Sequence, residues 1–194
     1  MQIHTAVKIA RAGDAERVSD ALVLAFSADP VTCYAFPEPT QHRVGFGAFA
    51  LALGGAALDR GTAFVTEGCR AAALWLAPGV EPDQDGVLAA FASVPPERLA
   101  AMHAIMEQMG NAHPAEPHWY LPLIGVDPAV QSQGLGSALL RHALADVDRE
   151  RLPAYLESTN PANVPLYQRY GFAVLGTIQI ADAPPIFPML RPPR

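Results

Sequence analysis

The sequence has little cysteine and no run of basic residues, and both features exclude classes of function. Only Cys33 and Cys69 are present among 194 residues, so a disulfide framework is not expected and no cysteine-based metal spacing exists. We expect two free thiols, as in a reducing cytoplasm. The formal net charge is −6, whereas nucleic-acid binding usually requires a positively charged face. The composition therefore argues against a metal and against a nucleic-acid partner, and it suits a cationic acceptor.

A hydrophobic run long enough to cross a membrane is also missing. The uncharged stretch from Val44 to Leu58 is shorter than the roughly 20 residues that a spanning helix needs, so we expect a buried helix and no membrane partner. The first residues, Met1–Thr5, lack the charged-then-apolar pattern of a secretory signal, and we expect a cytoplasmic protein. A chain of 194 residues with 51% hydrophobic content can bury a substantial core, and we expect one domain over residues 1–194.

Strand-like and helix-like segments alternate along the chain. Apolar alternation and β-branched residues predict strands at 6–10, 63–66, 72–76, 118–126, 153–158, 172–180 and 186–191. Helical spacing predicts helices at about 14–26, 41–58, 84–109 with a break at Pro95-Pro96, 135–150 and 161–170. Residues 30–40 and 111–117 are expected to be loops. The order predicts an α/β fold with a central mixed sheet flanked by helices.

The most informative segment is the glycine-containing stretch Gln131–Gly136, which lies between a strand-like run and an amphipathic helix. Unpaired N–H groups at a helix start, together with the helix dipole, form a site for an anion. Glycine allows a phosphate to approach the backbone closely. The segment therefore predicts a phosphate ligand, most simply the pyrophosphate of a cofactor.

Two common phosphate loops do not fit this segment. A P-loop ends in Gly-Lys-Ser/Thr, but Gly136 is followed by Ser137 and Ala138. A dinucleotide-binding loop needs a third small residue where Leu139 stands. The remaining pattern, Gln-x-x-Gly-x-Gly, resembles the acetyl-CoA loop of the GNAT superfamily of N-acetyltransferases.

The downstream sequence carries a second motif of the same superfamily. Leu156–Asn160, followed by Asn163–Phe172, is similar to its strand and short helix with an asparagine, a tyrosine and a closing Gly-Phe. Residues 116–121, 125–128, 133–138 and 161–167 resemble the branch that contains puromycin N-acetyltransferase. The resemblance is strongest over residues 116–172 and implies a GNAT fold with a splayed sheet, acetyl-CoA as the acyl donor and a small amine as the acceptor.

The resemblance also implies roles for individual residues. The splayed strand would bind the pantetheine arm and polarise the thioester oxygen through a backbone N–H near Ile124, and Pro122 and Gly125 suit an interrupted ladder there. The expected cofactor-binding residues are Ile124, Gly125, Val126, Gln131, Ser132, Gln133, Gly134, Leu135, Gly136, Ser137, Asn160, Asn163 and Tyr167. For Asn160 and Asn163, helix capping is the alternative.

Tyr167 is the candidate general acid for the leaving thiolate, with core packing as the alternative. Glu157 is the candidate base or amine clamp, because a carboxylate in an apolar strand is costly unless it is paired or functional. An ion pair with Arg169 or Arg70 is the alternative for Glu157. The expected acceptor pocket involves Asp29, Tyr34, Phe36, Trp75 and His118, although ordinary packing accounts equally well for an aromatic residue or a single histidine.

Three functions remain open from the sequence. The first is direct acetyl transfer from acetyl-CoA to a small amine in a ternary complex. The second is acetylation of a protein N-terminus or lysine, and the third is an acyl-CoA-binding module without turnover. The acceptor and the oligomeric state, with a homodimer as one option, are not readable from the sequence.

Overall fold

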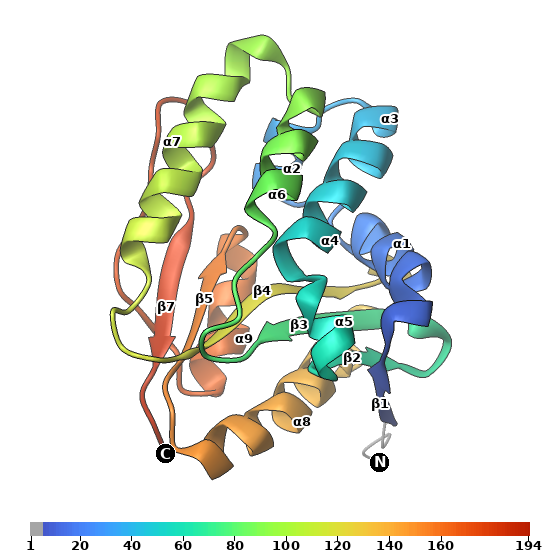
Figure 1. Cartoon of the computed structure of the whole chain (residues 1–194), viewed down its shortest axis with the longest axis vertical. Coiled ribbons are helices and arrows are strands. Elements are labelled where there is room, and N and C mark those ends of the chain that lie inside the picture. Colours follow the sequence, from blue (N-terminus) through green and yellow to red (C-terminus); the bar gives the residue numbers. More distant parts are fainter. Residues whose placement is uncertain (1–5) are drawn as a thin grey trace.

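Within residues 6–194, which the computed structural model describes, seven strands form one mixed sheet (Figure 1). The strand order is β1-β2-β3-β4-β5-β7-β6. The strands are β1 Val7–Ala10, β2 Ala63–Thr66, β3 Ala71–Leu76, β4 Trp119–Val126, β5 Ala154–Ser158, β6 Ala173–Val174 and β7 Phe187–Arg191. Neighbouring strands are antiparallel except β4 and β5, which are parallel. The expected mixed α/β sheet is confirmed, and the expectation for Met1–Thr5 lies outside the described residues.

The two central strands separate soon after they meet. β4 and β5 pair only at Trp119 with Ala154 and at Tyr120 with Tyr155. Beyond Tyr120 the two strands diverge, as Figure 1 shows. The predicted splay is therefore present, and among residues 6–194 no strand pairs with the edge of β4 from Leu121 to Val126 on the β5 side.

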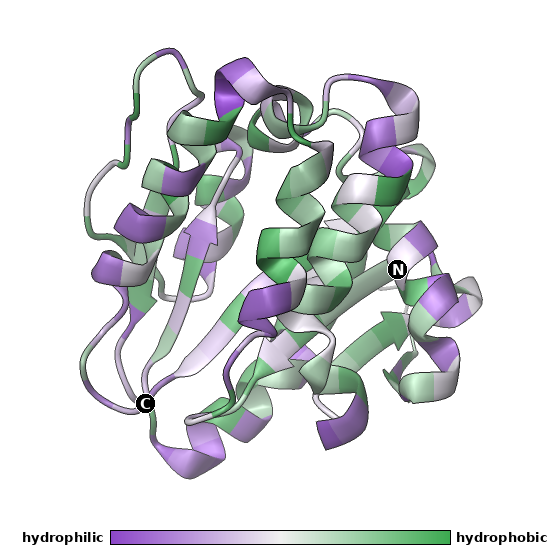
Figure 2. Cartoon of the chain, turned by 45° about the horizontal axis from the view of Figure 1, so that its top comes forward, coloured by the Kyte–Doolittle hydropathy of each residue, from purple (hydrophilic) through white to green (hydrophobic). Residues whose placement is uncertain are grey.

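Helices cover both faces of the sheet. Their bounds are α1 Ala15–Ala25, α2 Pro30–Ala35, α3 Pro39–Gln41, α4 Gly47–Gly54, α5 Ala56–Arg60, α6 Gln84–Ala90, α7 Pro96–Ala112, α8 Leu135–Glu150 and α9 Val164–Arg169. A π-helical turn, His42–Phe46, joins α3 to α4. One core packs α1, α4, α6 and α7 against the sheet, and the other packs α8 and α9 against the opposite face. Figure 2 shows mostly apolar residues on α4 and on several strands, with hydrophilic residues on outer helix turns and on part of the sheet.

Alternation along β3 divides its side chains between the two cores. Ala72, Leu74 and Leu76 belong to the core beneath α1 and α4, whereas Ala73 and Trp75 belong to the core beneath α8. This is the period-two geometry of a strand buried on both faces. It places Trp75 on the far side of the sheet from the helices that surround the acceptor region.

Three segments differ from the sequence-based expectations. Residues 30–40 contain α2, because Asp29 accepts a hydrogen bond from the Thr32 N–H and Pro30 takes the first helical position. The helix expected over 41–58 is interrupted by the π-helical turn and by Gly55. The strand expected over 172–180 is short, and only an isolated bridge at Ile178 continues it.

Gly125 lies beyond the point at which the β4–β5 ladder is interrupted. On the β3 side it pairs in register with Ala72, and the bulge there lies where Leu74 pairs with Leu123 but Leu76 pairs with Tyr120. A Cβ on Gly125 would lie 2.6 Å from the Ala25 Cβ. Gly125 therefore allows α1 to approach the sheet closely.

None of the described helices is both long and apolar enough to cross a bilayer.

Candidate active site

The glycine loop presents unpartnered backbone donors at the start of α8. The first bond of this helix runs from the Ala138 N–H to the Gly134 carbonyl, at 2.9 Å. The N–H groups of Leu135, Gly136 and Ser137 therefore have no helical acceptor. Ser132 and Gly134 both adopt positive φ, at 62° and 85°. Such alternation turns successive N–H groups to one side of a loop and forms an anion-binding concavity.

Hydrogen bonds between Asp127 and Arg70 hold the residues before this loop in place. The Asp127 N–H donates to the Arg70 carbonyl, and Arg70 Nε donates to Asp127 Oδ2 at 2.6 Å. Hydrogen bonding from the Ala129 N–H, and then from Arg70, lowers the pKa of Asp127. Gln131 Nε2 donates to the Val126 carbonyl at 3.3 Å. Gln131 thus ties the loop to the end of β4.

The open edge of β4 leads from this loop to the centre of the sheet. Ile124, Gly125 and Val126 pair with β3 on one side and have no strand on the other. In a strand, alternate N–H and C=O groups point to each edge, so this stretch offers unpaired groups to the gap. Pro122 lies within the bulge of β4, as expected from its missing donor.

Tyr167 lies on α9 beneath this gap. It lines a narrow cavity together with Leu121–Ile124 of β4 and with Glu157 and Ser158 of β5. Its side chain is buried, and its ring packs edge-on against Phe172. Burial, and then the charge of Asp29, raises the pKa of Tyr167. The hydroxyl therefore stays protonated and can act as a donor.

The two candidate asparagines occupy different environments. Asn160 Oδ1 accepts a hydrogen bond from the Ala162 N–H at 3.0 Å and caps a 3₁₀ turn. Asn163 makes no capping bond and lines the narrow cavity. Capping thus describes Asn160, and Asn163 remains available to a ligand.

Glu157 projects into the narrow cavity from the opposite strand. Its side chain is 2% exposed, and Oε1 lies 3.3 Å from His113 Nε2. Arg70 is engaged by Asp127 instead, so the ion pair considered with Arg70 is absent. Burial is the main cause of a raised pKa at both Tyr120 and Tyr155, and the Glu157 charge adds to it.

His113 is a site residue that sequence reasoning missed. It ends α7 and contacts His118, with 3.1 Å between His113 Nδ1 and His118 Nε2. Its ring also lies 4.5 Å from that of Tyr120 and 4.4 Å from that of Tyr155. The segment 111–117 carried no periodic signal, and its proximity to Glu157 arises only from the return of the chain into β4.

The residues expected in the acceptor pocket are not all brought together. Phe36 lines the narrow cavity, and His118 lines a wider one beside it. Asp29 is buried and accepts a hydrogen bond from Thr159 Oγ1 at 2.6 Å, which joins α2 to the end of β5. Tyr34 donates to Asp182 Oδ1 and lies outside both cavities. Trp75 is fully buried beneath α8 and also lies outside them.

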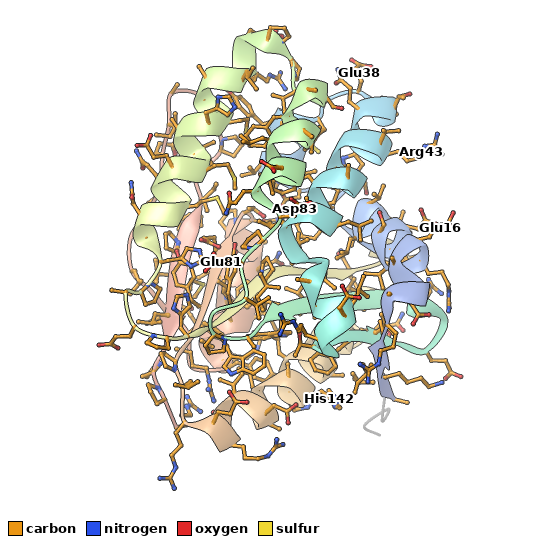
Figure 3. All side chains as sticks on the ribbon, viewed as in Figure 1. Glu16, Glu38, Arg43, Glu81, Asp83 and His142 are labelled. Atoms are coloured by element: carbon orange, nitrogen blue, oxygen red, sulfur yellow. The ribbon has the colours of Figure 1, made fainter. Side chains whose placement is uncertain are left out.

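The two cavities differ in size and in lining. The narrow cavity has a volume of about 80 Å³ and the wide cavity about 810 Å³. Apolar side chains from α2, α4 and α7 form most of the narrow one; they include Val31, Phe49, Leu53, Met102 and Met106. The wide one carries Glu81, His103, His113, Glu116 and His118. Figure 3 shows Glu81 on the segment before α6, far from His142 on α8.

The arrangement suits acyl transfer between an anionic carrier and an amine. The loop at α8 can hold phosphates, and the open edge of β4 can hold an extended arm as a strand would. Tyr167, which carries a hydroxyl donor, and Glu157, which carries a buried carboxylate, line the same cavity. The thiols lie elsewhere, since neither Cys33 nor Cys69 lines this cavity.

Comparison with known proteins agrees with this geometry. The sequence model of the acetyltransferase (GNAT) family matches residues 61–172. A mycothiol acetyltransferase of Gordonia bronchialis is 33% identical over 96 residues, which cover 46% of this chain and 28% of that protein. The chain spans about a third or less of the length of the curated relatives it matches. The likeness to the puromycin branch stays a prediction.

Solved structures match nearly the whole chain. A Corynebacterium glutamicum protein described as histone acetyltransferase HPA2 and related acetyltransferase has a TM-score of 0.71 and 26% identity, covering 99% of this chain and 98% of that one. Polyamine N-acetyltransferase of Drosophila melanogaster has a TM-score of 0.63 and 16% identity, covering 96% and 99%. The second similarity concerns the fold alone.

Proposed function

This chain belongs to the GNAT family of acetyltransferases, and from this premise we propose that it transfers the acetyl group of acetyl-CoA directly to the amine of a small molecule in a ternary complex. One observation carries the proposal. A single narrow cavity joins the open edge of β4, the Tyr167 hydroxyl and the Glu157 carboxylate. Donor and acceptor can therefore meet there without a covalent relay.

The glycine loop fits the pyrophosphate of acetyl-CoA. The free N–H groups of residues 135–137 and the α8 dipole favour negative charge at this point. The Gly134 Cβ position faces open space, so the backbone is accessible to a bulky anion. The pantetheine arm would lie along Leu121–Val126, which brings the thioester toward Tyr167 and Asn163.

The residues of the cavity have separate tasks in the transfer. A β4 N–H near Ile124 would donate a hydrogen bond to the thioester oxygen and stabilise the negative charge that develops on it. Glu157 would hold the acceptor ammonium and take a proton, because a neutral amine is the nucleophile. Tyr167 would donate to the thiolate that leaves. Burial, and then Asp29, raises the pKa of the Cys33 thiol, which disfavours a thiolate nucleophile and supports direct transfer.

The walls of the cavity favour an acceptor with an apolar body. Phe36, Phe46, Phe49 and Phe91 line it, and Glu157 supplies one carboxylate. A charged polyamine would leave its additional ammonium groups desolvated against these rings. A primary amine on an aromatic or aliphatic body would bury its apolar part and pair its one charge.

A panel of acceptors tests the proposal. Release of free CoA thiol is measured with 2-phenylethylamine, hexylamine, spermidine and a peptide with a free N-terminus. We expect the two monoamines to have higher kcat/KM values than spermidine and the peptide. Turnover of the peptide alone would favour a protein acetyltransferase, and acetyl-CoA binding with no turnover on any amine would favour a module without activity.

A pair of variants adds a control. Phe36→Ala removes part of the cavity wall and should lower kcat/KM for 2-phenylethylamine by about tenfold, the effect of losing roughly 1.4 kcal/mol of apolar contact. Tyr34→Phe changes a nearby ring outside the cavity and should leave that value unchanged. Equal effects of the two substitutions would contradict this location of the acceptor.

A further inference from the structure

A chain of three side chains connects the narrow cavity to the wide one. Glu157 is buried in the first, with Oε1 at 3.3 Å from His113 Nε2. His113 Nδ1 lies 3.1 Å from His118 Nε2, and His118 Nδ1 lies 2.7 Å from the Glu116 carbonyl oxygen. Both histidines line the wide cavity. The path therefore begins at a buried carboxylate and ends at a large opening.

The hydrogen positions along this path follow from its last acceptor. A carbonyl oxygen can only accept, so His118 Nδ1 carries a hydrogen and its Nε2, in the neutral ring, accepts. His113 Nδ1 must then donate to His118 Nε2. This leaves His113 Nε2 facing the Glu157 carboxylate, and a favourable contact there requires one proton shared between the two.

The other groups around Glu157 do not compete for that proton. Within residues 6–194, Tyr120 and Tyr155 are titratable side chains close to Glu157, and burial and then the Glu157 charge raise the pKa of both. Both hydroxyls stay neutral at ordinary pH and can only donate to the carboxylate. The Tyr155 hydroxyl and Glu157 Oε1 are buried, and neither has an aligned hydrogen-bond partner among residues 6–194. His113 is therefore placed to accept a proton from Glu157.

We propose that His113 and His118 form an exit path that carries the proton of the acceptor ammonium from Glu157 to solvent in the wide cavity. The inference rests on the proposed function. The ammonium gives a proton to Glu157, and the free amine forms the C–N bond as the C–S bond breaks. The nitrogen gives up a second proton, which replaces the one that Tyr167 donates to sulfur. One proton is left over in each turnover, and His113 passes it to His118 and to water.

Chemical rescue tests this path, since a small base can take the place of a missing imidazole. His113→Ala should lower kcat/KM for 2-phenylethylamine at pH 7 by about 10- to 100-fold. Added imidazole should restore much of the loss, because His113 is 27% exposed and faces the wide cavity. The difference from wild type should shrink above pH 9, where more of the amine arrives already deprotonated.

The control is His103→Ala, which removes an imidazole from the same cavity. His103 stacks on Phe91 and lines the wide cavity, which Glu157 does not line, so this variant should keep its rate and should not respond to imidazole. Equal rates for His113→Ala and wild type would overturn the proposal. A loss that imidazole does not relieve would assign His113 a structural role and would also overturn it. If His113→Ala does not fold, His113→Gln replaces it in the rate and pH measurements.

A second measurement does not depend on turnover. Nitrogen NMR of the histidine rings should show the neutral His118 ring with its hydrogen on Nδ1, and the His113 Nε2 resonance should move in Glu157→Gln while those of His103 stay. A hydrogen on His118 Nε2 would overturn the path. If wild type acetylates no amine but the NMR result holds, the proposed function fails and the arrangement of the three side chains stands.

Discussion

Replacement of Tyr167 by phenylalanine separates its chemical role from its packing. The ring packs against Phe172 and lines the narrow cavity, and phenylalanine keeps these contacts. We expect the free energy of unfolding and the affinity for acetyl-CoA to change little. The change should appear in kcat, because the hydroxyl is needed when the thiolate leaves.

The environment of the hydroxyl determines the expected size of this effect. Positioned acids contribute about 10²- to 10⁴-fold. Burial, and then Asp29, raises the pKa of Tyr167, which makes it a weaker acid that stabilises the thiolate mainly as a hydrogen-bond donor. The lower end, about 10²-fold or about 2.7 kcal/mol, is therefore expected. For the same reason, ionisation of Tyr167 should not reduce the wild-type rate up to about pH 10.

The assay is release of CoA thiol at saturating acetyl-CoA, with pre-steady-state measurements to establish that chemistry limits the rate. Tyr34→Phe is the control, since its hydroxyl bonds Asp182 outside the cavity. Tyr34→Phe should keep the wild-type kcat. An unchanged kcat in Tyr167→Phe under these conditions would refute the reasoning and would mean that water or another group protonates the thiolate.

Three further predictions concern stability and the order of the chemistry. Gly125→Ala should lower the free energy of unfolding by about 1–3 kcal/mol because its Cβ would overlap helix α1, whereas Gly176→Ala, at an open position, should change it little in urea titrations. The buried tyrosines Tyr120, Tyr155 and Tyr167 have raised pKa values in the folded protein, so they ionise at lower pH in the unfolded chain. The free energy of unfolding should therefore be unaffected by them below pH 10 and should fall above it by up to about 1.4 kcal/mol per tyrosine per pH unit. The fall should be less steep in Tyr155→Phe. Initial-rate lines for the two substrates should intersect and Cys33→Ser should keep activity; parallel lines, or acetyl label retained on the protein, would point to an acetyl-enzyme.

The sequence was sufficient to predict the parts of the site that are built from segments adjacent along the chain. The loop 131–134 lies between β4 and α8 as expected, because a strand, a glycine-containing turn and an amphipathic run are neighbours along the chain. The beginning of α2 could not be inferred in the same way. Helix α1 ends at Ala25, whereas Asp29 caps α2 and Pro30 takes its first position. The rule that disfavours helix before proline predicts an end to the first helix, and it does not predict the start of a second one.

Which side chains meet in the site depends on the face of the sheet that each residue occupies and on contacts between segments that are far apart in the sequence. Trp75 was expected near the acceptor, but the alternation of β3 turns it toward α8. An ion pair with an arginine was the alternative considered for Glu157, but the end of α7 places His113 beside it, 44 residues earlier in the chain. Neither fact has a local signal, because both depend on how the strands are ordered in the sheet.

Calorimetric titration with acetyl-CoA shows whether the loop before α8 holds the cofactor, on which the proposed function depends. Gly134 and Gly79 both have positive φ, at 85° and 78°, and both have open space at the Cβ position, so valine strains the backbone similarly at each. We predict that Gly134→Val binds acetyl-CoA at least about tenfold more weakly than wild type, since the side chain blocks approach to the N–H groups. Gly79→Val should bind it as wild type does. Equal affinities in all three proteins would contradict a cofactor site at this loop.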